Sequence, residues 1–122
     1  MQDFRDLVVW RKAHDLAVGI YRLSRGFPRE EAYGLTSQIR RACTSIPANI
    51  AEGCGRSSDL DFARFLHIAM GSACELEYYL LLAQELEYMT EEEAAPFSVN
   101  LAEIKKMLSG LIKKLRAAHR DH

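Results

Sequence analysis

Residues 58–87 read SDLDFARFLHIAMGSACELEYYLLLAQELE and hold a long helical pattern. Ser58 is a suitable N-cap, and Asp61 stands three residues later, as in a capping box that has Asp in place of Glu. Apolar and small side chains then recur every three or four residues, the spacing of the stripe that a helix buries in a bundle. The stripe consists of Phe62, Phe65, Ala69, Ser72, Leu76, Tyr79, Ala83 and Leu86. This pattern predicts one long helix packed against others.

Three further stretches show the same periodicity. Residues 7–24 are amphipathic and stop before Gly26 and Pro28, which do not continue a helix. Residues 30–52 form a second stretch, and a last one opens at Thr90-Glu91-Glu92-Glu93, a capping box with acids at the positive end of the helix dipole. The fold class we expect is all-α, an antiparallel up-down four-helix bundle in a single domain of residues 1–122.

The second stretch carries a proline in its interior. Pro47 lacks the N–H that would bond to the carbonyl of Cys43, and its ring crowds that carbonyl. The apolar stripe nevertheless keeps its phase from one side of Pro47 to the other, which favours a kinked helix over two shorter helices. The stripe contains Leu35, Ile39, Ala42, Ile46, Ile50 and Gly53.

Composition and net charge limit the classes of protein to which the chain can belong. The chain has 122 residues and a formal net charge of −1, which counts against a dedicated nucleic-acid binder but leaves room for a local basic patch. No apolar run is long enough to span a membrane. The N-terminus has no secretory pattern, and the cysteines Cys43, Cys54 and Cys74 form no CxxC pair. We therefore expect reduced thiols and a cytoplasmic protein.

No catalytic or metal-binding constellation stands out. Di-iron bundles need Glu three residues before His on two helices, but Arg11, Arg64, Arg116 and His119 hold those positions here. Gly53-Cys54-Gly55 lacks the lysine and the strand of a phosphate-binding loop. We expect a protein that is not an enzyme and that uses no cofactor, metal or small-molecule substrate.

Residues 78–83 are apolar all round, which a helix in a monomeric bundle would not tolerate. This surplus predicts a homo-oligomer. The expected interface consists of Leu66, Met70, Tyr78, Leu80, Leu81 and Leu82. The alternative is that a loop or the N-terminal segment with Phe4 covers the patch.

Two polar groupings are candidate sites. The first lies on the second and third helices, where a buried hydrogen-bond network with Arg41 paired to Glu52 or Glu75 competes with a ligand or partner site. Its members are Arg41, Ser45, Asn49, Glu52 and Glu75. The second is a basic strip near the C-terminus, either a solvated outer face or a surface for phosphates. Its members are Lys105, Lys106, Lys113, Arg116 and Arg120.

Residues 40–53, RRACTSIPANIAEG, together with FRDLVVW at residues 4–10 and GSACE at residues 71–75, resemble the four helix bundle protein family. Founding members of that family are encoded in intervening sequences of bacterial 23S ribosomal RNA genes. The resemblance implies a bundle that assembles as a ring, a homopentamer, with no established enzymatic activity. A similar protein, the accessory protein of diversity-generating retroelements, forms such a pentamer and binds nucleic acid through a strongly basic surface.

Two functions of different class follow. One is an RNA- or DNA-binding accessory protein that acts as a homopentamer and presents the basic strip, and the net charge of −1 departs from the retroelement protein on this point. The other is a protein–protein interaction scaffold without nucleic-acid binding. Binding that weakens steeply with salt would separate the first from the second.

Overall fold

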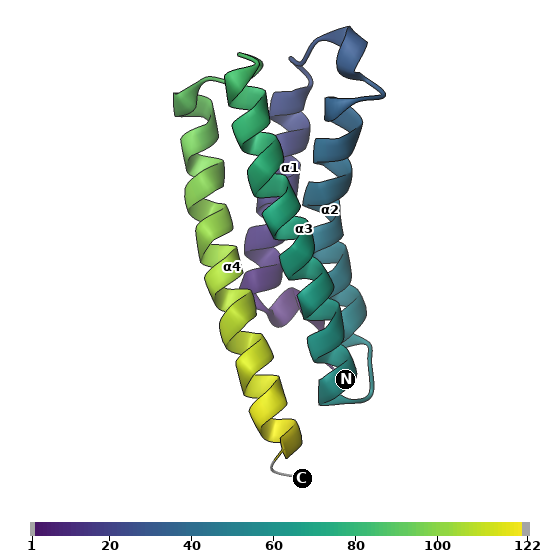
Figure 1. Ribbon diagram of the computed structural model, residues 1–122. Coiled ribbons are helices and arrows are strands. Elements are labelled where there is room, and N and C mark those ends of the chain that lie inside the picture. The colour runs from purple at the N-terminus through teal and green to yellow at the C-terminus, as the bar shows by residue number, and fades with distance from the viewer. Residues whose placement is uncertain (1, 121–122) are drawn as a thin grey trace.

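The four expected helices are present and alternate in direction along one bundle, as Figure 1 shows for a computed structural model that describes residues 2–120. The all-α, antiparallel up-down architecture is thereby confirmed. Two short 3-10 helices, η1 (Phe4–Asp6) and η2 (Arg29–Glu31), precede α1 and α2. The main helices are α1 (Val8–Ser24), α2 (Leu35–Cys54), α3 (Asp59–Glu85) and α4 (Glu91–Arg120).

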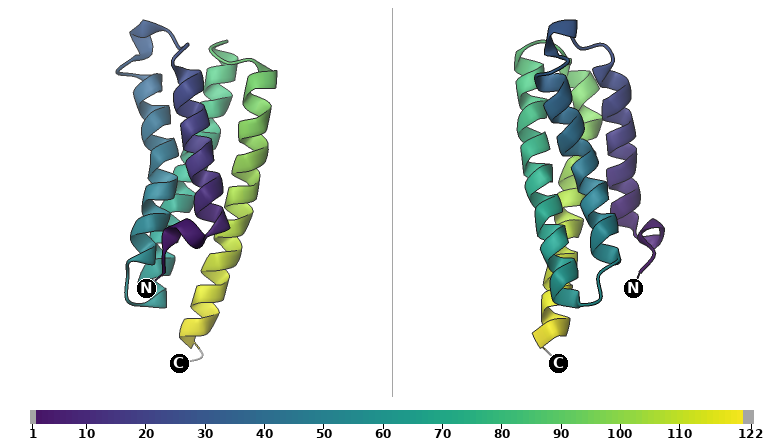
Figure 2. Two further views of the ribbon diagram at one scale, coloured as in Figure 1. Left: turned by 180° about the vertical axis from the view of Figure 1, so that it is seen from behind. Right: turned by 90° about the vertical axis from the view of Figure 1, so that its right-hand side faces the viewer.

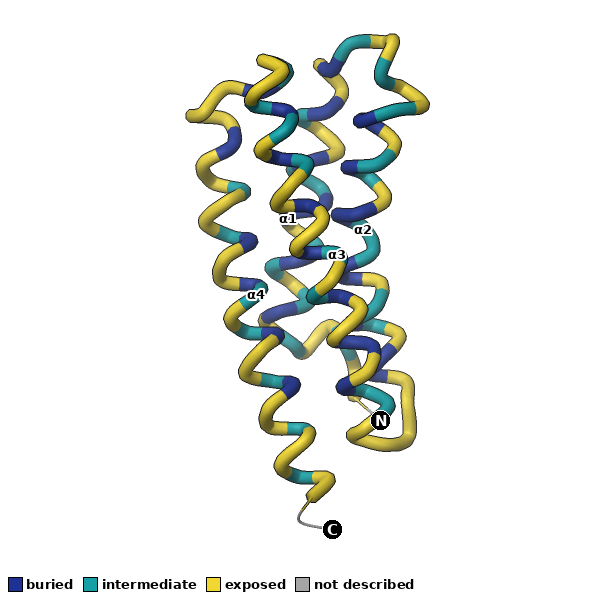
Figure 3. Tube along the Cα trace, in the orientation of Figure 1, coloured by how far each residue is buried: buried dark blue, intermediate teal, exposed yellow. Residues whose placement is uncertain are grey.

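Each helix packs against two neighbours. α1 contacts α2 and α4, and α3 contacts α2 and α4, so α1 lies diagonally opposite α3, and α2 opposite α4. Figure 2 shows the same long helices side by side from two further directions. One continuous core runs between them, and its side chains come from all four helices. Figure 3 shows that buried positions recur along every helix on the inner side. The largest fully buried side chains include Leu16, Ile20, Ile39, Ile46, Ile50, Leu66, Leu76, Leu80, Leu101, Ile104 and Leu108.

Both predicted caps are formed. The Asp61 N–H donates to Ser58 Oγ at 3.1 Å, which fixes the start of α3. At the start of α4, the Glu93 N–H donates to Thr90 Oγ1 at 3.1 Å and the Thr90 N–H donates to Glu93 Oε1 at 2.9 Å. This reciprocal pair satisfies two N–H groups that a helix end leaves without partners.

The start of α2 differs from the prediction. Instead of one helix from Glu30, the chain forms η2 and then begins α2 at Leu35. Glu31 explains the break, because its Oε1 accepts a hydrogen bond from the Leu35 N–H at 3.1 Å and so caps α2 from outside. Gly34 permits this approach, since a Cβ there would lie 2.6 Å from the same oxygen.

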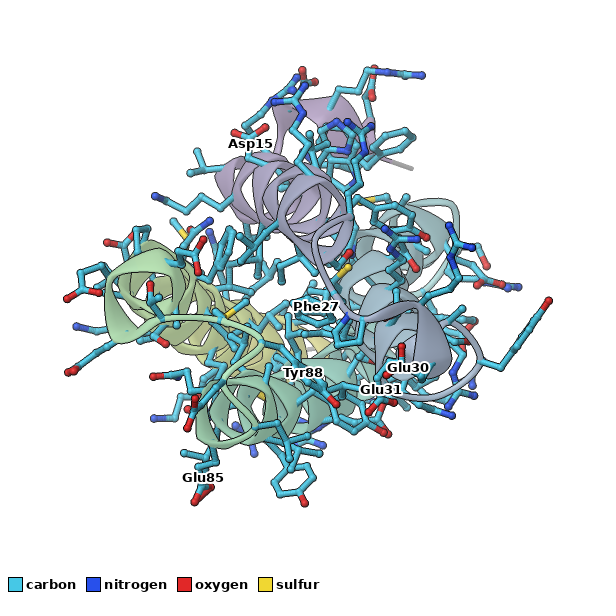
Figure 4. All side chains as sticks on the ribbon, turned by 90° about the horizontal axis from the view of Figure 1, so that it is seen from above. Asp15, Phe27, Glu30, Glu31, Glu85 and Tyr88 are labelled. Carbon is cyan, nitrogen blue, oxygen red and sulfur yellow. The ribbon has the colours of Figure 1, made fainter. Side chains whose placement is uncertain are left out.

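Aromatic rings close the end of the bundle near η2. Phe27 is buried, and its ring centroid lies 5.7 Å from that of Tyr88 (Figure 4). The Tyr88 hydroxyl donates to Glu31 Oε2 at 2.8 Å. The hydrogen bonds from the Leu35 N–H and the Tyr88 hydroxyl lower the pKa of Glu31, whereas the bond to Glu31 raises the pKa of Tyr88. The connections before α2 and before α4 are thus joined to each other.

α2 continues through Pro47 without interruption, so the proline does not divide it into two helices. All six residues of its predicted stripe are buried. Thr44 Oγ1 donates to the Arg40 carbonyl at 2.9 Å, a bond from side chain to backbone that Ser and Thr often form within helices. The predicted kink stays a prediction.

The three- and four-residue spacing of apolar residues in α4 predicts a buried stripe through Leu108, Leu111 and Leu115, and the structure differs from it after Leu108. Ile112 is buried, whereas Leu111 and Leu115 are only half-buried. Spacings of three and four residues are equally compatible with a helix, so sequence did not decide between Leu111 and Ile112. The stripe turns because this part of α4 extends toward the free end of the bundle, where Figure 1 shows fewer helices around it.

The N-terminal segment folds against α1 and the end of α2. The Gln2 N–H donates to the Cys54 carbonyl at 3.2 Å, and the Phe4 ring lies 4.8 Å from that of Trp10. Phe4 therefore does not cover residues 78–83 of α3. Within residues 2–120, no helix combines the length and apolarity needed to cross a membrane.

Candidate nucleic-acid interface

The charge on α4 is divided between its two halves. From Glu91 to Ile104 the helix carries four acids and no Lys or Arg, and from Lys105 to Arg120 it carries six Lys or Arg and no acid. Acids near the start and cations near the end suit the dipole of the helix. Because the acids and the cations lie in different halves of α4, the chain has a local basic surface although its net charge is −1.

The basic strip lies on this C-terminal half, and its members differ in how they are bound. Lys105 is half-buried and its Nζ lies 3.1 Å from Glu77 Oε1, an ion pair between α4 and α3. Arg116 Nη2 lies 2.7 Å from His67 Nε2. Lys106, Lys113 and Arg120 are exposed and form no ion pair with any residue between 2 and 120. These three are free to meet an anion.

α3 adds two side chains to this surface that the sequence did not single out. Arg64 and His67 line, together with Arg116, a groove of about 550 Å³ between the start of α3 and the end of α4. A guanidinium can only donate, so His67 Nε2 accepts the hydrogen bond from Arg116. Arg64 is partly neutralised, since its Nε lies 2.9 Å from Asp61 Oδ1. The three-residue spacing from Arg64 to His67 places both side chains on one face of a helix. The sequence does not show, however, that α4 packs beside that face.

The predicted polar grouping on α2 comes together only in part. The Ser45 and Ser72 hydroxyls are 2.8 Å apart and join α2 to α3. Asn49 Nδ2 donates to Ser45 Oγ at 3.0 Å and to the Ser45 carbonyl at 2.8 Å. These half-buried groups therefore satisfy one another, which is the arrangement of a structural network.

The charged members of that grouping, Arg41, Glu52 and Glu75, are not part of the network around Ser45. Arg41 Nη2 donates to Gln38 Oε1, so the expected pairing of Arg41 with Glu52 or Glu75 is wrong. Glu52 instead pairs with Arg56 at 2.9 Å, because eleven residues along a helix separate Arg41 from Glu52 by about 16 Å. Glu75 is exposed and has no ion pair within residues 2–120.

The predicted oligomer interface divides into buried and exposed members. Leu66 and Leu80 are 0% and 2% exposed in the core of this one chain, so their assignment to an interface is wrong. A helix between two neighbours buries a broad face, which on α3 includes Leu66 and Leu80 beside the predicted stripe. Met70 and Leu82 are half-buried. Tyr78 and Leu81 remain 57% and 52% exposed, and Leu60 and Ile68 extend the same outer face of α3.

Two of the three cysteines are small side chains in the core. Cys43 and Cys54 are buried, and burial raises the pKa of the Cys43 thiol to about 12. Burial also raises the pKa of Cys54. Cys74 is exposed on α3. Among residues 2–120, no three His, Cys, Asp or Glu side chains gather as metal ligands.

Comparison with known proteins gives the chain a family. Curated proteins include no match to it. One solved structure is similar to most of this chain. It is the structure of a protein with unknown function from the S23 ribosomal protein family of Bacteroides thetaiotaomicron VPI-5482. It is 36% identical over 87% of this chain and 99% of the other, with a TM-score of 0.78. The model of the family described as 23S rRNA-intervening sequence protein matches residues 5–110, and the chain belongs to that family.

Proposed function

We propose that this protein is a non-enzymatic RNA-binding accessory protein that contacts phosphates through the C-terminal half of α4. The observation that carries the proposal is the run of six cations without an acid between Lys105 and Arg120. Four of them, Lys106, Lys113, Lys114 and Arg120, are exposed and unpaired within the described chain. We place its action in the cytoplasm, where the three cysteines stay reduced.

A helix that presents cations along one side suits the regularly spaced charges of a nucleic-acid backbone. Lys106, Lys113 and Arg120 recur every seven residues, or two turns, so they share one side of α4 over about 21 Å. Neutralising phosphates releases counterions and yields affinity without base selectivity. The family description names 23S rRNA, which fits RNA as the ligand but says nothing of binding.

Self-association strengthens this proposal. Tyr78 and Leu81 are more than half exposed on the outer face of α3, which favours a contact with further copies of the chain. A ring of copies would repeat the basic strip and multiply its phosphate contacts. The resemblance of the sequence implies a homopentamer, so light scattering should give five times the mass of 13.9 kDa. A mass of one chain would contradict this part.

The second candidate is a protein–protein scaffold, and the same exposed face of α3 favours it. The two candidates differ in what nuclease digestion does. A scaffold keeps its protein partner after the RNA is removed, whereas an RNA-binding protein loses what it held through RNA.

Binding of a fluorescently labelled RNA hairpin, followed by anisotropy, tests the proposal. We expect binding at about 50 mM salt and a loss of at least about tenfold in affinity at about 200 mM. The variant with Lys106→Gln, Lys113→Gln and Arg120→Gln should bind weakly at either salt concentration. Absence of wild-type binding at the lower concentration would overturn the proposal and leave the scaffold.

A further inference from the structure

A groove of about 360 Å³ lies between α1 and α2, beside Pro47. In Figure 4 these two helices lie across the bundle from the junction of α3 and α4, so the groove is separate from the basic strip. Ala17, Val18 and Pro47 give it an apolar lining. Its volume falls within the range of sites for small organic groups.

Apart from Thr44, the rest of the lining is aromatic and cationic. His14 and Tyr21 both line the groove and stand two helical turns apart on α1. Arg22 and Arg25 line it as well, and no acidic residue is among the described residues that do so. Aromatic rings beside guanidinium groups and without carboxylates are suited to planar, negatively charged ligands.

Neighbouring side chains hold these rings in place. The imidazole of His14 stacks on the Trp10 indole, with centroids 5.0 Å apart and planes 9° from parallel. The Arg40 guanidinium lies 4.8 Å above the Tyr21 ring, and its Nη2 also donates to the Tyr21 carbonyl at 3.2 Å. Tyr21 is 41% exposed, so part of its ring remains accessible. The rings are therefore positioned before any ligand arrives.

We infer that this groove binds one nucleotide of single-stranded RNA. The base stacks on the Tyr21 or His14 ring over the apolar lining, and the adjoining phosphates contact Arg22 and Arg25. Stacking on aromatic side chains combined with a positively charged groove is the usual way of holding a single strand without sequence preference. The inference rests on the proposed function, because it takes RNA as the ligand, and it adds a second contact surface on different helices.

Trp10 makes the groove observable. It is the only tryptophan of the chain and stacks on His14, so its fluorescence reports on this end of the groove. The probe is single-stranded oligoadenylate of about ten nucleotides, a length that one small domain accommodates. We expect it to quench Trp10, whereas duplex RNA of equal length, whose bases are already stacked, should bind the basic strip without quenching.

Tyr21→Ala removes a stacking ring and should weaken oligoadenylate binding about tenfold, the usual effect of losing one aromatic platform. Tyr33→Ala is the matched control, since Tyr33 is 99% exposed and does not line the groove. Val18→Leu narrows the groove without adding or removing a ring or a charge and should also weaken binding. The melting temperature of each variant shows whether it is folded.

The outcomes separate this inference from the proposed function. If wild-type protein binds oligoadenylate without quenching, and Tyr21→Ala and Val18→Leu bind as tightly as wild type, the groove is not a nucleotide site while the basic strip remains. If the wild type binds no RNA at all, both fail. If Tyr21→Ala instead lowers the mass of the assembly, a second copy occupies the groove and the inference is wrong.

Discussion

Between Leu35 and Cys54, α2 buries ten residues, whereas α4 between Lys105 and Arg120 buries only Leu108 and Ile112. The polar groups differ as well. Ser45 and Asn49 of α2 are bonded within the protein, while Lys106 of α4 faces solvent. This difference indicates that α2 and its contacts with α3 stabilise the fold. The end of α4 contributes little to that fold and is available to a partner.

The largest expected difference between the two regions concerns buried volume. Ile46 is 0% exposed, so Ile46→Ala should lower the free energy of unfolding by about 2–5 kcal/mol. Leu115 is half-buried on α4, and Leu115→Ala should cost about 1 kcal/mol. Urea denaturation of both variants checks this. Equal losses would show that the end of α4 is part of the stabilising core.

Two glycines give a comparison with opposite signs. A Cβ on Gly53 of α2 would lie 2.8 Å from Phe62 Cδ1 and 3.0 Å from Phe65 Cβ, so Gly53→Ala should cost about 1–3 kcal/mol through overpacking. A Cβ on Gly110 of α4 meets nothing within 4 Å. Gly110→Ala should therefore gain about 0.5–1 kcal/mol from helix propensity. Thermal unfolding distinguishes the two, and a destabilised Gly110→Ala would mean that this surface is already covered.

The smallest effect concerns pH at the closed end of the bundle. The pKa of Glu31 is lowered in the folded protein, so its charge adds stability above the ordinary value of 4.5. That contribution is lost as pH falls through the folded pKa. The melting temperature of Glu31→Gln should thus be lower than that of wild type at about pH 7 and approach it at about pH 3. A difference that persists in acid would mean that packing, not charge, is responsible.

Much of the fold could be predicted because local signals agreed with packing. The capping residues Ser58 and Thr90 and the glycine after α1 placed three helices to within two residues or so. The start of α2 was missed because its cap is supplied by Glu31, a residue outside the helix, through an approach that only Gly34 allows. A side-chain cap from outside the helix leaves no periodic trace in the sequence.

The candidate surfaces were predicted less completely. The basic strip was visible because its charges follow helical spacing on one helix. The groove between α1 and α2 was not, since Trp10 and Tyr21 share the apolar face of α1 in the sequence. Ala13, Leu16 and Ile20 fill the core instead and leave Tyr21 outside it. Residues 66 and 80 were misassigned because periodicity does not say how wide a face the neighbouring helices cover.

We propose that the free cations of α4 contact phosphates, so the affinity for RNA should depend on salt through these side chains. Each phosphate contact to a single strand contributes about −0.7 to the slope of log affinity against log salt. Replacing Lys106, Lys113 and Arg120 by Gln should make the slope shallower by about 2. The matched control replaces Arg11, Arg29 and Arg41 by Gln, which removes equal exposed charge elsewhere, and its slope should equal that of wild type. Equal slopes in both triple variants would contradict the proposal that the free cations of α4 contact phosphates.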